Sequence, residues 1–185
     1  QELFAEYEAM DDRAVEAAVI RSATVFDDWH RRSFEERAAI LQQVAAVLKE
    51  KKEDLGGLIT REMGKTLAEA IAEVEKCAWV CEYYATGAAG FLQDEVISTD
   101  YSHSLVRYQP IGTVLAIMPW NFPFWQVFRF AAPTLMAGNT VLLKHAANVS
   151  GCALAIQRIF EEAGAKPGLF QSLLVPPAMV ESILR

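Results

Sequence analysis

The stretch IGTVLAIMPWNFP, residues 111–123, decides the fold that we expect for this chain. Its first eight residues form a continuous apolar strand, and such strands are typical of parallel sheets that are covered on both faces. A helix should follow from about Pro123 to Ala137, because proline suits a first helical turn and Gly138 suits the exit. The chain therefore begins a strand–helix–strand unit here.

The same order is repeated downstream. NTVLLK (139–144) reads as a second strand, a helix is expected from Ser150 to about Gly164, and LFQSLLV (169–175) reads as a third strand. Short connections between alternating strands and helices are what βαβ units require. We therefore predict an α/β fold that contains the first half of a doubly wound, Rossmann-like parallel sheet.

The residues before this sheet are predicted to be helical. Capping signals indicate three helices that begin after Asp11, Ser33 and Thr66, the last two in capping boxes. Gly56-Gly57 is expected to bend or interrupt the second helix, and Gly64 to end it. We expect the three helices to form one packed layer.

The predicted organisation has three parts. Residues 1–94 form the helical part of a cofactor-binding domain, and residues 110–185 form its first βαβαβ half. Residues 95–109 contain two short strand patterns, VIS and SLVRY. An isolated two-stranded ribbon is marginal in water, so these residues are predicted to bridge to another subunit. Three strands leave an uncovered sheet edge, and the fold is therefore expected to be incomplete.

Composition excludes several classes of partner. The chain of 185 residues is 22% charged and has a formal net charge of −7, which argues against nucleic acid as the main partner. No apolar run reaches the ~18 residues that a membrane span needs. The first twenty residues are acidic and mixed, unlike a signal peptide. We expect a cytoplasmic protein without a nucleic-acid or membrane partner.

The three cysteines are interpreted as structural. Cys77 and Cys81 lie four residues apart, a spacing that a metal could use, but no histidine or acidic cluster accompanies them. Cys152 could be a nucleophile in principle, although no acid partner is evident. No metal site is predicted. One helix face is interpreted as solvated, namely that of Glu73, Glu75 and Lys76.

The segment MPWNFPFWQVFRF, residues 118–130, carries the candidate chemistry. It lies outside the carboxyl end of the first parallel strand, where open α/β sheets build ligand sites. Pro119 and Pro123 fix φ on either side of Asn121, so a stiff loop could aim the carboxamide at a reacting atom. From the spacing alone, however, the favoured interpretation is that Asn121 caps the following helix.

The motifs change that interpretation. PWNFP after an apolar strand, followed by LLK at the next strand end, resembles the aldehyde dehydrogenase superfamily. The resemblance extends over ITREMGK (59–65), QPIGTVLAIMPWNFP (109–123) and PTLMAGNTVLLKHAANVSGCALA (133–155), and so covers nearly the whole chain. The segment KHAANVSGCA is similar to one branch of the NAD(P)-dependent succinate-semialdehyde dehydrogenases. The resemblance implies oxidation of a small-molecule aldehyde to its carboxylate, with NADP or NAD as cofactor.

The resemblance also implies roles for single residues. Asn121 would donate its amide to the thiohemiacetal oxygen, which is oxyanion stabilisation. Lys144 would bind the adenosine ribose or its 2′-phosphate, unless it is simply a surface lysine. Members that favour NAD often carry glutamate where this chain has Ala147, so we expect NADP use at least comparable to NAD. The implied cofactor-binding set is Met118, Pro119, Trp120, Asn121, Lys144, His145, Ala146 and Ala147. His145 is interpreted as a loop residue beside the cofactor rather than a base.

Substrate class depends on Arg129. The helix after Pro123 should place Phe122, Trp125, Gln126 and Arg129 on one face, which looks towards the aldehyde tunnel in the resembled fold. An arginine on an aromatic wall needs an anion, and its two-pronged geometry suits a carboxylate. The resemblance therefore implies succinate semialdehyde or a similar acidic aldehyde. The alternative for Arg129 is an intramolecular salt bridge.

The remaining catalytic parts are expected elsewhere. The family's catalytic cysteine, its glutamate and its TGS-like motif would lie beyond Arg185, so the catalytic domain is absent and the chain alone should not turn over. We expect a piece of a longer enzyme that assembles as a homo-dimer or homo-tetramer. Two alternatives stay open. One is a dehydrogenase for another aldehyde, such as glutarate semialdehyde or an aromatic aldehyde; the other is a truncated, non-catalytic remnant or interaction module.

Overall fold

The structure is a computed structural model that describes residues 5–184. Its centre is a parallel sheet, as predicted, and the strand order is β3-β4-β5. The strands are β3 (Thr113–Met118), β4 (Thr140–His145) and β5 (Phe170–Ser172). Met118 lies opposite His145 in the register, so β3 and β4 end together at one edge of the sheet. This edge carries the candidate site.

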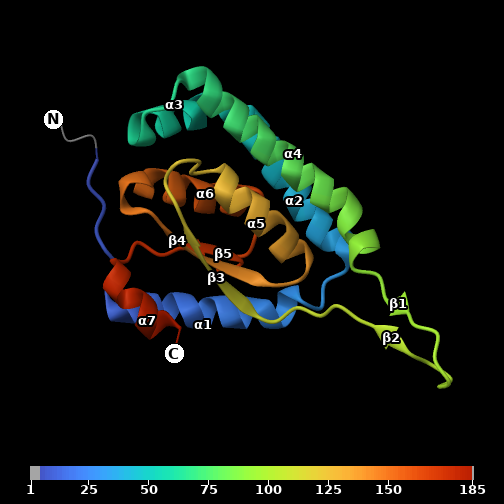
Figure 1. Ribbon diagram of the computed structural model, residues 1–185. Coiled ribbons are helices and arrows are strands. Elements are labelled where there is room, and N and C mark those ends of the chain that lie inside the picture. Colours follow the sequence, from blue (N-terminus) through green and yellow to red (C-terminus); the bar gives the residue numbers. More distant parts are fainter. Residues whose placement is uncertain (1–4, 185) are drawn as a thin grey trace.

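Helices cover both faces of the sheet, which confirms the prediction from its apolar strands. In Figure 1, α1 (Asp12–Trp29) lies along one face, whereas α5 (Trp125–Met136) and α6 (Ser150–Glu162) lie on the other. Four stacked aromatic rings run through the second face, with centroid separations of 6.1, 5.8 and 4.5 Å. In order, these rings are Phe124, Phe128, Phe160 and Phe170.

The prediction that the first three helices form one layer is wrong. α1 begins after Asp11 as expected, but it packs against the sheet rather than against the other N-terminal helices. Gln171 of β5 donates its side-chain amide to the carbonyl of Ala18 at 2.7 Å, and the Ser22 hydroxyl donates to the carbonyl of Gly168 at 2.8 Å. Small residues on α1 let the helix approach the sheet closely, and without α1 this face would be exposed to water.

The other N-terminal helices pack outside α5 and α6 (Figure 1). They are α2 (Phe34–Glu50), α3 (Lys52–Met63) and α4 (Leu67–Phe91). Both predicted capping boxes are present, one at Ser33 and one at Thr66, and Gly64 ends α3 with a φ of +84°. The break between the first two helices lies at Lys51 instead of Gly56-Gly57, and both glycines are inside α3.

The connections differ slightly from the predicted bounds. α5 starts two residues after Pro123, and Gly138 follows its end with a φ of +94°. A short 3₁₀ helix, η1 (Ala147–Val149), precedes α6. The described chain ends with η2 (Pro177–Met179) and α7 (Val180–Ile183).

The predicted strand pair is an antiparallel hairpin that extends away from the body of the molecule (Figure 1). It comprises β1 (Glu95–Val96) and β2 (Leu105–Val106). Large apolar side chains are exposed along it, including Val96 and Tyr101 at 82% each. Its role in bridging subunits stays a prediction. Over residues 5–184, none of the helices combines the length and the apolar character that a membrane crossing requires.

The two glycines of α3 give a paired test of the packing. A Cβ on Gly56 would lie 2.8 Å from Cγ1 of Ile71 on α4, whereas a Cβ on Gly57 would meet nothing within 4 Å. Gly57→Ala should raise the free energy of unfolding by about 0.5–1 kcal/mol through helix propensity. Gly56→Ala should lower it, because overpacking costs about 1–3 kcal/mol. Equilibrium urea unfolding measures both, and a gain in both variants would contradict the close approach of α3 and α4.

Candidate active site at the carboxyl edge of the sheet

The loop that leaves β3 is exposed at its tip and buried where it enters α5. Pro119, Trp120, Asn121 and Phe122 are exposed, whereas Pro123 and Phe124 are buried. The candidate catalytic amide thus projects from the carboxyl edge on a short segment with a fixed base.

His145 of β4 binds the buried end of this loop. The backbone N–H of Ala146 donates to Nδ1 of His145 at 2.9 Å, so Nε2 carries the hydrogen and donates to the carbonyl of Pro123 at 2.9 Å. Burial lowers the pKa of His145, which favours the neutral ring. His145 is the last residue of β4 and is buried, so the expectation of a loop residue is wrong. Both ring nitrogens are engaged within the protein.

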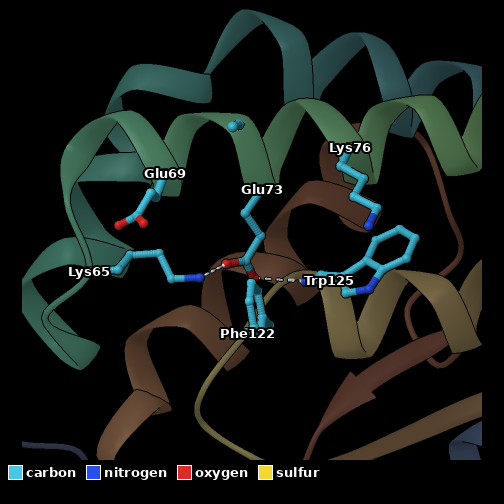
Figure 2. A pocket seen from close by; sticks show the side chains of 7 residues that line it. Lys65, Glu69, Glu73, Lys76, Phe122 and Trp125 are labelled. Carbon is cyan, nitrogen blue, oxygen red and sulfur yellow. Dashed lines mark hydrogen bonds and ion pairs between the residues drawn. The ribbon is translucent and has the colours of Figure 1, made fainter.

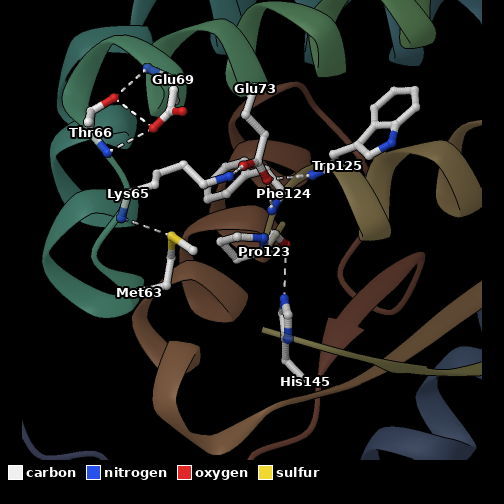
Figure 3. A network of polar contacts seen from close by, with 9 residues as sticks. All are labelled: Met63, Lys65, Thr66, Glu69, Glu73, Pro123, Phe124, Trp125 and His145. Atoms are coloured by element: carbon white, nitrogen blue, oxygen red, sulfur yellow. Dashed lines mark hydrogen bonds and ion pairs between the residues drawn. The ribbon is translucent and has the colours of Figure 1, made fainter. Parts of the chain in front are cut away.

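Glu73 of α4 holds the base from the other side (Figure 3). One oxygen, Oε1, accepts from the backbone N–H groups of Phe124 and Trp125 at 2.8 and 2.9 Å. The other oxygen pairs with the ammonium of Lys65, and only 3% of the Glu73 side chain and 9% of the Lys65 side chain are exposed. The start of α5 has no side-chain cap of its own, and Glu73 supplies one from another helix.

The interpretation of Glu73 as part of a solvated face is therefore wrong, whereas Glu75 and Lys76 are exposed as expected. The buried face of α4 includes Ala70, Val74 and Cys77, with Glu73 among them. Glu73 follows the buried Ala70 by three residues and precedes the buried Cys77 by four. This helical spacing could have identified Glu73 as a buried carboxylate.

Asn121 does not cap α5, contrary to the interpretation from spacing alone. The amides at the helix start that need a cap donate to Glu73 instead. Within residues 5–184 the Asn121 side chain makes no hydrogen bond to another protein group. Its carboxamide is thus available at the exposed tip of the loop, beside the ends of β3 and β4.

A cavity of about 480 Å³ lies between α4 and the start of α5 (Figure 2). Two of its aromatic walls are each contacted by a lysine: Lys65 Nζ lies 3.9 Å from the ring centroid of Phe122, and Lys76 Nζ lies 4.0 Å from that of Trp125. The lining residues are Lys65, Glu69, Ala72, Glu73, Lys76, Phe122 and Trp125. The structure thus brings together two of the predicted substrate residues.

The other two predicted substrate residues follow on α5. Gln126 is half-buried and Arg129 is exposed. Arg129 lies four residues after Trp125 and so on the same side of the helix. Arg129 forms no salt bridge in the described part of the chain, so the alternative of an intramolecular ion pair is wrong there.

The predicted cofactor residues lie in two groups on one sheet edge. Met118 is half-buried at the end of β3, next to the exposed Pro119 and Trp120, while Lys144 and His145 end β4. A second cavity, of about 440 Å³, lies at the ends of β4 and β5, and its lining includes His145 and Ala147. No ion pair holds Lys144 within residues 5–184.

The start of α6 is capped in the same way as that of α5. The carboxylate of Glu62 accepts from the backbone N–H groups of Gly151 and Cys152, each at 2.8 Å. Burial, followed by the charge of Glu62, raises the pKa of the Cys152 thiol, so it is not a nucleophile at neutral pH. All three cysteines are buried and free, and no metal-binding cluster occurs among the described residues.

The buried His145 predicts a pH dependence of stability. Its pKa is lowered in the folded chain, so the unfolded chain binds the proton first as pH falls below 6.5. Protonation would also remove the acceptor that Nδ1 offers to Ala146. The free energy of unfolding should therefore fall as the pH is lowered below 6.5, and more gently in His145→Gln. Urea unfolding across this range measures both slopes; equal slopes would contradict the buried neutral ring.

Several known proteins are similar to this chain in sequence and in fold. The profile of the aldehyde dehydrogenase family matches residues 1–184. A probable NADP+ succinate-semialdehyde dehydrogenase of Synechocystis is 52% identical over 161 residues, which are 87% of this chain and 36% of that protein. NADP+ succinate-semialdehyde dehydrogenase 1 of Mycobacterium tuberculosis is 46% identical over 97% of this chain and 40% of its own length.

A solved structure agrees with these relatives. The crystal structure of a succinic semialdehyde dehydrogenase from Streptococcus pyogenes, in complex with NADP+, superposes with a TM-score of 0.95 at 32% identity. The superposition covers 98% of this chain and 40% of that one. The chain thus spans two fifths or less of the length of these three relatives, and it matches one continuous family profile throughout. The chain belongs to the aldehyde dehydrogenase family.

Proposed function

We propose that this chain forms the cofactor-binding part of an enzyme that oxidises succinate semialdehyde, or a similar acidic aldehyde, to the carboxylate. The observation that carries the proposal is Arg129. It is an exposed guanidinium without an ion pair in the described residues, on the side of α5 that presents Trp125. A planar, two-pronged donor in that position suits the carboxylate at the far end of such a substrate.

In the proposed reaction Asn121 stabilises negative charge. A cysteine thiolate from a part of the enzyme outside residues 1–185 attacks the aldehyde carbon, and the carbonyl oxygen becomes an oxyanion. The Asn121 carboxamide, which makes no hydrogen bond within residues 5–184, donates to that oxygen. Hydride then leaves the carbon, and a glutamate outside this chain activates the water that hydrolyses the thioester. Losing one oxyanion donor typically costs ~2.7–4 kcal/mol of transition-state stabilisation.

The cofactor proposed for this site is NADP, with NAD as a second possibility. When bound, it accepts the hydride that the aldehyde carbon loses. The residues fit such a group, because Lys144, near the end of β4, has no ion pair within the described residues, and Ala147 adds neither bulk nor negative charge beside the second cavity. The relatives from Synechocystis and Mycobacterium tuberculosis are named as NADP+ enzymes, which supports the proposal.

Replacing Arg129 tests the substrate class in the complete enzyme. Arg129→Leu should lower kcat/KM for succinate semialdehyde about 10–100-fold, since hydrogen bonds to a charged group contribute ~1.5–3 kcal/mol. Butanal, which has the same chain length without the carboxylate, should change less than about threefold on the same scale. Steady-state kinetics with both aldehydes measures the difference.

The matched control is Arg31→Leu, which removes an exposed arginine near the end of α1. It should leave both substrates unaffected. Equal losses for the two aldehydes in Arg129→Leu, or better turnover of benzaldehyde than of succinate semialdehyde by the unaltered enzyme, would argue for a different aldehyde.

Replacing Ala147 tests the cofactor. Ala147→Glu places a carboxylate where the 2′-phosphate of NADP is proposed to lie, and like charges in contact cost several kcal/mol. Accordingly, kcat/KM for NADP should fall at least about tenfold, with NAD changed much less. Ala147→Gln has the same size without the charge and should keep NADP use. A loss of NADP use in both variants would show that steric bulk, and not charge, is responsible.

A further inference from the structure

We propose that Glu73, with Lys65 as its counter-ion, is a positioning residue that sets the aim of Asn121. Neither residue is placed to react with the substrate in the proposed mechanism. They act on the segment that carries the oxyanion donor, and the inference therefore rests on the proposed function of Asn121.

The exposed loop is short and is fixed at both ends. At one end the backbone N–H of Ala146, which is shared with Nδ1 of His145, also donates to the carbonyl of Met118 at 3.1 Å. At the other end the carbonyl of Phe122 accepts from the backbone N–H of Gln126 at 3.0 Å. The carbonyl of Pro123, held by His145, and the amide of Phe124, held by Glu73, follow directly. Only three residues, 119–121, lie between the anchored carbonyls of Met118 and Phe122.

Asn121 has little conformational freedom within this span. It lies two residues from each of Pro119 and Pro123, whose rings fix φ. The direction of its side chain is thus set by where the two ends are held. A shift of about 1 Å in a group that must meet a developing charge can cost on the order of 10²-fold in rate. The base of the loop is therefore where positioning is decided.

Glu73 is suited to hold that base, and an apolar residue is not. Its carboxylate satisfies two backbone N–H groups of a buried helix start, and these would otherwise have no partner. Its charge also matches the positive end of the α5 dipole. A buried ion pair is often no more stable than a well-packed apolar pair. The stability of the ion pair therefore does not explain why Lys65 and Glu73 are charged. The two backbone amides that the carboxylate binds explain it better.

Lys65 completes the arrangement. It comes from the turn between α3 and α4, and its ammonium lies between the Glu73 carboxylate and the ring of Phe122, the residue next to Asn121 (Figure 2). Lys65 thus contacts the tip of the loop as well as its anchor. The pair connects α4, the loop and the start of α5 in one set of contacts (Figure 3).

A double-mutant cycle in the complete enzyme separates positioning from simple stabilisation. Asn121→Ala should lower kcat on the order of 10²–10³-fold. Glu73→Ala should lower kcat at least about tenfold with little change in KM for the aldehyde, because the misaimed donor acts only in the transition state. In the double variant the two losses should not multiply: kcat should be close to that of Asn121→Ala alone.

Glu62→Ala is the matched control. It removes a carboxylate that binds two backbone amides of α6, a cap of the same design that does not contact the loop. Its melting temperature should fall by an amount comparable to that of Glu73→Ala, while its kcat should stay within about twofold. A similar loss of kcat in Glu62→Ala would overturn the inference, because it would reduce Glu73 to one of two stabilising caps.

The other outcomes are also distinct. If Asn121→Ala keeps full activity, the proposed function fails and the inference fails with it. If Asn121→Ala lowers kcat and the double variant loses the full product of both single effects, the proposed role of Asn121 survives. The positioning role of Glu73 is then overturned. Should Glu73→Ala not fold, Glu73→Gln replaces it in the cycle. Glu73→Gln keeps an oxygen that can accept from both amides, so we expect a smaller loss of kcat. Added to Asn121→Ala, it should cause no further loss.

Discussion

The backbone N–H groups of Phe124 and Trp125 face the interior at the point where an exposed loop becomes a buried helix. Helix starts leave such donors without intrahelical partners, and a buried donor without any partner is costly. In this chain a carboxylate from another helix binds both. Much of the surrounding structure follows from that requirement, because α4 must pass within reach of the start of α5 and must carry an acid on its buried face.

The ITREMGK segment makes this passage possible. Gly64 ends α3 in a left-handed conformation, and the capping box at Thr66 starts α4 two residues later. The turn in between presents Lys65 towards Glu73, and the preceding turn of α3 presents Glu62 towards α6. One short motif thus supplies a cap for α6 and the counter-ion for the cap of α5. The motif spans seven residues because the cap of α6, the turn at Gly64 and the counter-ion of Glu73 all come from it.

These caps also constrain how an anionic cofactor can be held. Helix starts at the carboxyl edge of a parallel sheet are natural phosphate sites. Here the amides that would serve, at the starts of α5 and α6, already bind carboxylates. A phosphate that bound these amides would have to displace Glu73 or Glu62. On the described edge, Lys144 is then the group left to attract negative charge, which agrees with the lack of a glycine-rich GxGxxG motif in the sequence.

Local signals in the sequence were sufficient to predict most helices and strands, but not the contacts of the candidate site. The capping boxes, the apolar strands and the exit glycines act over a few residues, so the predictions from them are confirmed at Ser33, Thr66 and Gly138. The placement of α1 depends on Gln171, about 150 residues away, and no periodicity encodes it. The cap of α5 likewise depends on Glu73, which is 51 residues before Phe124. Without that contact, Asn121 is the natural candidate for the cap, and the correct assignment releases it for chemistry.

The same assignment separates the cations in and beside the cavity into two groups. Lys65 is neutralised by a buried carboxylate and is committed to holding the loop. Within the described residues, Lys76 and Arg129 have no such partner. Lys76 lies over the ring of Trp125, and Arg129 follows Trp125 by about one turn of α5. On the proposed function, the carboxylate of an acidic aldehyde would be attracted by these two cations, whereas a neutral aldehyde would not. On the two proposals, the buried pair sets geometry and the exposed cations set substrate selectivity, so that changes in one group need not disturb the other.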